Sequence, residues 1–116
     1  MLTPDPQDVP FLPIAGEVYR IRTIICQPPD KHDTRPAVVV ASPFALTGRI
    51  TFVTRTSQTE SAGVPHPRNS VLDLSRDGVF SRLRSVEAQL WTPRNVTRLG
   101  VLEQTVFAAV IERFWT

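Results

Sequence analysis

The stretch RPAVVVASPF, residues 35–44, decides the fold. Its centre, residues 36–41, is a short apolar run rich in β-branched valine and bounded by turn-forming residues, which is typical of a strand covered on both faces. A turn over residues 43–48 follows, and RITFVTRTS, residues 49–57, alternates apolar and polar side chains as another strand. Upstream, GEVYRIRTII, residues 16–25, indicates a strand with one solvated face.

Downstream of this unit, the polar residues 58–69 hold no apolar periodicity and predict a loop. Residues 70–74 and 80–90 are further strand candidates, and Asp77-Gly78 between them favours a tight hairpin turn. Residues 91–100 predict a short connection. The apolar period then becomes that of a helix, whose buried face is formed by Leu102, Val106, Phe107, Val110, Ile111 and Phe114. Several short strands followed by one helix predict a mainly β fold, a small antiparallel barrel with a C-terminal helix.

The first residues differ in composition from the rest. Proline recurs through residues 1–13, which predicts a stiffened, extended arm that is flexible relative to the folded domain of residues 14–116. The arm has neither the basic nor the apolar region of a secretory signal. The longest apolar run, residues 37–41, is much shorter than a membrane span. We therefore expect a cytoplasmic protein without a membrane partner.

Composition excludes several classes of function. The chain has 116 residues, 41% of them hydrophobic, so it is long enough for one domain and too apolar for a disordered chain. Cys26 is the only cysteine, which excludes a disulfide scaffold. His32 and His66 have no second ligand at metal-binding spacing, and the glycines are too scattered for a phosphate-binding loop. We therefore expect neither a metal nor another cofactor.

Two neighbouring features favour an anion-binding surface. Arg35 ends a polar loop and immediately precedes the buried strand, so its guanidinium is expected at a rigid strand mouth. The strand over residues 49–57 continues into Thr54-Arg55-Thr56-Ser57-Gln58, and strand alternation places both threonines on one face and Arg55 on the other. Hydroxyl, amide and guanidinium groups can together bind phosphates and base edges of single-stranded RNA. The plainer alternative is an ion pair between Arg35 and Asp33 at a polar strand end.

Several landmarks follow one another along residues 16–114. They are Gly16-Glu17-Val18-Tyr19, Arg35-Pro36-Ala37-Val38-Val39, Thr47-Gly48, the strand end Thr56-Ser57, Ala88-Gln89, and Leu99-Gly100 before the amphipathic helix. In this order they resemble the MazF/PemK/Kid toxins of toxin–antitoxin systems. The resemblance covers nearly the whole predicted domain.

What the resemblance implies is a homodimeric SH3-like barrel that cleaves single-stranded RNA at selected sequences and is neutralised by an antitoxin protein. Arg35 matches the family's catalytic arginine and Thr56 its catalytic threonine, with Ser57 and Gln58 continuing the RNA-binding edge. Cleavage in the family needs no metal: the ribose 2′-OH attacks the neighbouring phosphate and leaves a cyclic phosphate and a free 5′-OH. Here Arg35 is expected to stabilise the charge on the phosphorane, and Thr56 to position the phosphate.

The loop before Arg35 departs from the family pattern. It reads QPPDKHDT, residues 27–34, where the family usually has Gly-Ser-Glu-Gln followed by small residues. His32 lies in this loop, and an imidazole near the site is a candidate RNA contact and proton carrier, because imidazoles titrate near neutral pH. The alternative is a solvated histidine in a loop.

Two further departures concern the strands. Thr54-Arg55 replaces the family's usual proline and apolar pair, so Thr54 and Thr56 both compete for the catalytic position. We expect Thr54 and Arg55 to contact RNA, and Arg49 to flank the groove. Ala88 stands where the family has an aspartate, so this chain lacks a carboxylate there.

Two other classes of function remain open. One is a non-catalytic module on the same barrel, either an RNA-binding relic or a gyrase poison like the CcdB toxins, which depend on their C-terminal residues. Here the chain ends in Phe114-Trp115-Thr116, a sequence that indicates packing rather than such a tail. The other is an interaction protein that has no nucleic-acid partner.

Overall fold

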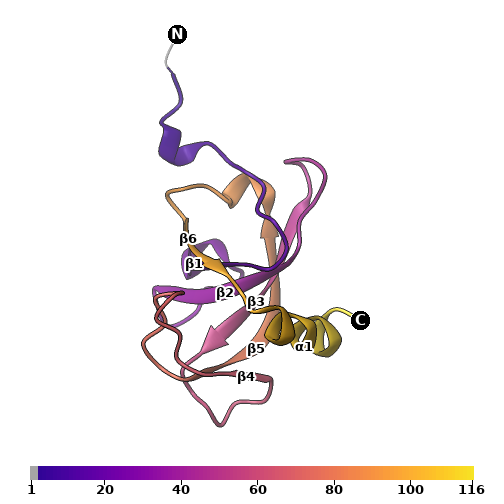
Figure 1. Cartoon of the computed structure of the whole chain (residues 1–116). Coiled ribbons are helices and arrows are strands. Elements are labelled where there is room, and N and C mark those ends of the chain that lie inside the picture. Colours follow the sequence, from indigo (N-terminus) through magenta and orange to yellow (C-terminus); the bar gives the residue numbers. More distant parts are fainter. Residues whose placement is uncertain (1–2) are drawn as a thin grey trace.

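The computed structural model describes residues 3–116, and its centre is a curled, six-stranded sheet in which all neighbours are antiparallel (Figure 1). Across the sheet the strands follow the order β4-β5-β3-β2-β1-β6, so β3 and β2 lie in the middle. A single helix, α1, follows the last strand. The elements are β1 (Glu17–Arg22), β2 (Thr34–Ala41), β3 (Arg49–Thr56), β4 (Val64–His66), β5 (Gly78–Glu87), β6 (Val96–Val101) and α1 (Gln104–Phe114). The predicted mainly β fold with a C-terminal helix is confirmed.

Strand β2 is buried on both faces, as its valine run predicts. Ala37 and Val39 belong to one hydrophobic cluster, whereas Val38 and Val40 belong to a second. Successive side chains of a strand point to opposite faces, so the two clusters lie on opposite sides of the sheet. A central strand of this kind is held by apolar contacts from both directions, which makes the start of β2 a rigid support for neighbouring side chains.

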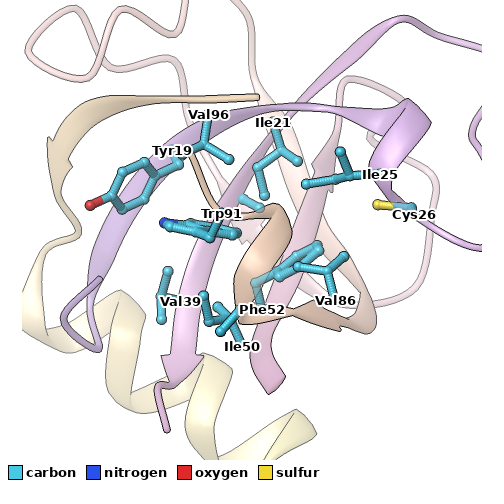
Figure 2. Close-up of a cluster of buried hydrophobic side chains, with 12 residues drawn as sticks. Tyr19, Ile21, Ile25, Cys26, Val39, Ile50, Phe52, Val86, Trp91 and Val96 are labelled. Carbon is cyan, nitrogen blue, oxygen red and sulfur yellow. The ribbon is translucent and has the colours of Figure 1, made fainter. Parts of the chain in front are cut away.

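The first cluster is built around Trp91, which is fully buried (Figure 2). The ring of Tyr19 meets the indole edge to face at a centroid distance of 5.1 Å, and the ring of Phe52 lies 5.8 Å from it. Trp91 follows a short 3-10 turn, Ala88–Leu90, that caps this side of the sheet. The predicted strand over residues 80–90 therefore ends at Glu87, because the chain folds over the cluster there.

Helix α1 covers the second cluster. Val110 is completely buried, and Val106, Phe107, Ile111 and Phe114 pack around it, which confirms the predicted apolar face. The helix begins at Gln104 rather than at Leu102, whose backbone N–H donates to the carbonyl of Gly16 at 2.9 Å. Leu102 is nevertheless buried in the same cluster.

The expected strand over residues 70–74 and its hairpin are wrong. These residues form turns with one isolated bridge, between Asn69 and Leu74. The side chain of Asn69 accepts a hydrogen bond from the N–H of Leu72 at 3.1 Å, and Asp73 has a φ of 54°, so local bonds replace a strand ladder. Strand β5 pairs instead with β3 and with β4, which lies inside the predicted loop of residues 58–69.

Strand β6 was not expected, because residues 91–100 predict a connection. It pairs with β1 and forms an edge of the sheet. Three of its six residues are exposed, two are half-buried, and Val96 at one end is buried. The strand therefore lacks the apolar alternation from which strands are predicted.

The N-terminal segment contacts the sheet before β1 begins. Phe11 and Leu12 pack against the first cluster, and the N–H of Phe11 donates to the carbonyl of Trp91 at 3.1 Å. Arg94 forms ion pairs with Asp8 at 2.6 Å and Asp5 at 3.3 Å. The first described residues extend away from the sheet (Figure 1). The domain boundary at residue 14 and the flexibility of the arm stay predictions.

Candidate functional site

Arg35, near the start of β2, forms a two-point ion pair with Asp30 of the preceding loop. Arg35 Nε lies 3.0 Å from Asp30 Oδ2, and Arg35 Nη2 lies 3.2 Å from Asp30 Oδ1. The hydrogen bonds from the guanidinium lower the pKa of Asp30 to about 2, and the backbone N–H of His32, which donates to Oδ1, adds to this effect. The partner of Arg35 is thus Asp30 and not Asp33, whose side chain is exposed and forms no ion pair among residues 3–116.

The register between β2 and β3 places Arg35 beside the threonines that the sequence singles out. Ala37 pairs with Thr54, and the same register continued by two residues brings Arg35 level with Thr56. Directly paired residues share one face of a sheet, and Ala37 faces the first cluster. Arg35, Thr54 and Thr56 therefore lie at the same end of that face.

Two arginines that the sequence reasoning missed lie on this face too. Thr54 pairs with Arg82, and Phe52, a member of the first cluster, pairs with Arg84 of β5. Arg82 is exposed, whereas Arg84 is half-buried and donates from Nη2 to the carbonyl of Pro28. The signal for them was the alternating Arg-Leu-Arg of residues 82–84 within a predicted strand. We refer to Arg35, Thr54, Thr56, Arg82 and Arg84 as the basic face.

A pocket of about 360 Å³ opens beside the basic face, where β2 begins and β3 ends. His32, Arg35 and Ser57 line it together, so the structure brings these three predicted site residues to one place. Its wall is completed by Asp33, Thr34, Pro36, Arg55 and Arg76.

The remaining predicted residues at the end of β3 lie outside this wall. The hydroxyl oxygen of Thr56 accepts a hydrogen bond from the N–H of Gln58 at 3.2 Å, which turns the chain at the strand end. Gln58 is exposed, and Thr54 is half-buried with its hydroxyl 3.4 Å from the carbonyl oxygen of Arg82. The edge of β3 thus offers two threonine hydroxyls to the basic face and Ser57 to the pocket.

Arg55 is placed differently from the other site residues, because it is only 4% exposed. Strand alternation directs it to the face opposite Thr54 and Thr56, as the sequence predicts. Its guanidinium donates to backbone carbonyls and to His66. Burial lowers the pKa of Arg55 from its usual value, although the guanidinium stays charged near neutral pH.

The other residues singled out in the sequence make contacts within the fold. Ala88 is fully buried in the first cluster, and the side chain of Gln89 donates to the carbonyl of Leu46 at 3.1 Å. Arg49 donates to the hydroxyl and the carbonyl of Ser85. Burial raises the pKa of the Cys26 thiol, which disfavours a reactive thiolate.

Residues 3–116 contain no cluster of metal ligands and no helix that could span a membrane. In this part of the chain, no three side chains of His, Cys, Asp or Glu gather as a metal site would require. None of its helices has both the length and the apolar character needed to cross a membrane.

Comparison with known proteins supports the fold. No family model matches the chain, and no curated protein matches it in sequence. Solved structures do match. MazF (Form-I) from Deinococcus radiodurans is 21% identical, with a TM-score of 0.64 over 89% of this chain and 93% of that one. Two forms of the MazE–MazF crystal structure from the same organism match similarly.

The two MazE–MazF structures match this chain about as well as MazF alone does. Form-II is 21% identical with a TM-score of 0.62, and covers 89% of this chain and 91% of that chain. Form-III is 20% identical with a TM-score of 0.61, and covers 89% and 92%. The resemblance read from the sequence is therefore confirmed at the level of the structure, and this chain has the MazF fold.

Proposed function

We propose that this chain is a MazF-type toxin, a metal-independent endoribonuclease that cleaves single-stranded RNA such as mRNA at selected sequences. The observation that carries the proposal is the position of Arg35. Asp30 holds the Arg35 side chain near the start of the buried strand β2, where Arg35 is level with Thr56, and the chain has the fold of MazF.

The basic face supplies the groups that such a reaction needs. In the cleavage step the ribose 2′-oxygen forms a bond to the neighbouring phosphorus, and the bond from phosphorus to the 5′-oxygen breaks. The phosphorane carries extra negative charge on its non-bridging oxygens, and Arg35 stabilises that charge through its guanidinium. Thr56 or Thr54 donates a hydroxyl hydrogen bond to the phosphate and holds it in line with the 2′-oxygen.

Two protons must move for the reaction to balance. The 2′-OH loses one, and the 5′-oxygen gains one as it leaves. We propose His32 as the group that exchanges protons with the reacting oxygens, because it lines the same pocket as Arg35 and an imidazole can both accept and donate near neutral pH. Its exposed position in the loop lets its ring approach a bound RNA strand.

Arginines beside the reacting phosphate extend the binding surface. Arg82 and Arg84 continue the basic face along β5, and the guanidinium groups suit the phosphates of neighbouring nucleotides. Ser57 and Gln58, at the exposed end of β3, offer hydroxyl and amide groups to base edges. The RNA would run across the ends of β2 and β3 and then along β5.

The proposal includes protein partners. The matched structures include complexes of MazF with MazE, and we propose an antitoxin of that kind as the partner of this chain in the cytoplasm. We further propose a homodimer, for which the fully exposed Phe44 and the exposed Ile14 provide apolar surface. Light scattering of the purified protein, with Phe44→Ser as the matched variant, tests the dimer: a monomeric wild type would contradict it.

RNA cleavage by purified protein tests the enzyme directly. Wild type, Arg35→Ala and Arg113→Ala are incubated with a mixed pool of single-stranded RNA in the presence of EDTA. Arg113 is exposed on α1 and controls for the loss of one positive charge. We expect cleavage by wild type and Arg113→Ala and none by Arg35→Ala. An RNA pool left intact by wild type would overturn the enzyme, and binding without cleavage would favour the non-catalytic module.

A further inference from the structure

The arginine that the proposed reaction does not use is the most extensively bonded side chain near the site. Arg55 donates from Nε to His66 Nδ1 at 3.0 Å, and from Nη2 to the carbonyls of His66 at 2.9 Å and Arg76 at 2.7 Å. A third carbonyl, that of Pro67, lies 3.4 Å from Nη2. These donors face the protein interior, so Arg55 can form the pocket wall but has few donors left for RNA.

The imidazole of His66 is the unusual partner in this arrangement. A buried arginine is commonly paired with a carboxylate, whereas here its Nε donates to a ring nitrogen that can accept only while it carries no proton. We assign the proton to Nε2, because that nitrogen lies 3.3 Å from Glu103 Oε2. His66 is 2% exposed, and its bond to Arg55 lies in the interior, whereas Glu103 reaches it from the surface.

His66 thus connects several elements to the end of β3. It belongs to β4, Arg55 reaches it from β3, and the carboxylate of Glu103 reaches it from the residue before α1. The ring of Phe80 from β5 lies 5.3 Å away. The charged groups around His66 are Arg55, Glu103 and Asp77. Glu103 is also bound by the side-chain amide of Asn69. Asp77 lines a small pocket with His66, and its charge opposes the lowering of the Arg55 pKa by burial.

Close packing against Gly78 fixes the position of the Arg55 guanidinium. A Cβ atom built on Gly78 would lie 2.6 Å from Arg55 Nη1 and 2.6 Å from the carbonyl oxygen of Thr56. Only glycine leaves room here for the guanidinium and the strand to pass β5 so closely. The position of Arg55 is therefore coupled to that of the Thr56 backbone.

We propose that Arg55 is a positioning residue, which holds the end of β3 in register with Arg35 through its bond to an unprotonated His66. Arg55 lies between Thr54 and Thr56, so fixing its side chain fixes the backbone that presents both hydroxyls. The next residue, Ser57, lines the pocket with Arg35. The effect on cleavage rests on the ribonuclease function proposed above, whereas the effect on the strand end does not.

Protonation of His66 would break its hydrogen bond to Arg55 and free the end of β3. An imidazolium has no lone pair for Arg55 Nε, and it would place a second positive charge beside a buried guanidinium. Burial and the charge of Arg55 lower the pKa of His66, while Glu103 opposes that shift. The bond is therefore intact at neutral pH, and the end of β3 should loosen once the pH is low enough to protonate His66.

Nuclear magnetic resonance on the full chain can follow the strand end without any RNA. The amide signals of Thr56 and Ser57 and the ring signals of His66 are recorded from about pH 8 down to the lowest pH at which the protein stays folded. His66→Asn keeps an acceptor oxygen near the position of Nδ1 and removes the titration. His32→Asn, in the other histidine of the sequence, serves as the matched control.

We expect the Thr56 and Ser57 amides to titrate with the His66 ring in wild type and in His32→Asn, and to stay constant in His66→Asn. Amides that do not titrate in wild type, or that titrate equally in His66→Asn, would overturn the proposal. If they titrate as expected while wild type cleaves no RNA at any pH, the positioning of the strand end stands and the ribonuclease function fails.

Cleavage kinetics provide the second readout. In Arg55→Lys an ammonium cannot make all the bonds of the guanidinium, so we expect kcat to fall by about tenfold or more while KM for RNA changes by less than about threefold. In His66→Asn the fall in kcat toward acidic pH should be smaller than in wild type, because the strand end no longer responds to protonation of His66. A folded Arg55→Lys protein with the kcat of wild type would contradict a positioning role.

Discussion

Arg35 is bound by Asp30 through two hydrogen bonds, 3.0 Å and 3.2 Å long. A two-point contact of this kind fixes the plane of a guanidinium as well as its position. Asp30 uses both oxygens for Arg35 and takes a further bond from the backbone of its own loop. The loop that differs most from the family pattern therefore supplies the group that orients the proposed catalytic arginine.

Asp30→Asn should impair the reaction by disturbing this orientation. An amide offers one oxygen where the carboxylate offers two, so we expect kcat to fall about tenfold, or about 1.4 kcal/mol of transition-state stabilisation. Asp33→Asn makes the same chemical change at an exposed neighbour that forms no ion pair within residues 3–116. Equal losses in the two variants, measured by single-turnover RNA cleavage, would mean that the ion pair does not orient Arg35.

The two arginines of β5 should contribute to the salt dependence of RNA binding. If Arg82 and Arg84 each contact one phosphate, the double variant Arg82→Gln/Arg84→Gln should bind RNA more weakly and lower the slope of log affinity against log salt by about 1.4. Arg68→Gln/Arg113→Gln removes the same charge from exposed positions outside the basic face. Fluorescence anisotropy at several salt concentrations measures both, and an unchanged slope in the β5 variant would exclude these contacts.

The sequence predicted the central elements because their side chains report their surroundings directly. The valine run of β2 indicates burial on both faces, and the period of α1 indicates one apolar face, which is what the clusters show. Strands β4 and β6 lie at the two edges of the sheet. Strand β4 has only three residues, and β6 lacks a regular alternation of buried and exposed side chains, so neither gives such a signal. The turn after Asn69 depends on side-chain bonds that a composition pattern does not reveal.

The site was predictable only in part for a related reason. Arg35 and the threonines stand out by their place at strand ends, but the partner of Arg35 depends on how the loop folds back. The same holds for Arg55, whose burial depends on the pairing of β5 with β4, a strand that lies inside a predicted loop. Arg82 and Arg84 lie on the basic face because of the register between β5 and β3. The register between two strands cannot be predicted from the sequence of either strand alone.

Folding stability should depend on His66 in mildly acidic solution. The pKa of His66 is lower in the folded protein than the ordinary value of 6.5, so the unfolded chain takes up the proton first as the pH falls. The free energy of unfolding should then be constant above about pH 6.5 and decrease below it, by at most about 1.4 kcal/mol per pH unit. Urea unfolding measures this, and an equal decrease in His66→Asn would assign the effect to other groups.

The segment before β1 should contribute to stability through Phe11. This ring packs on the first cluster at 6.1 Å from the ring of Tyr19. Because Phe11 is only half-buried, we expect Phe11→Ala to cost about 1–2 kcal/mol, less than the about 3–5 kcal/mol of a fully buried phenylalanine. Val71→Ala, at a position that is 86% exposed, should change stability by less than about 0.5 kcal/mol. A Phe11→Ala protein as stable as wild type would show that the segment is detached in solution.

The central claim is that Arg35 promotes attack of a ribose 2′-OH on the adjacent phosphate without a metal. The most direct measurement is mass spectrometry of the product ends, from one RNA oligonucleotide and its copy with a 2′-deoxy sugar at the cleaved position, in EDTA. Wild type should give a 2′,3′-cyclic phosphate and a 5′-OH from the RNA and nothing from the copy, and Arg35→Ala should cleave neither. Products that carry a 5′-phosphate, or cleavage of the deoxy copy, would contradict the account.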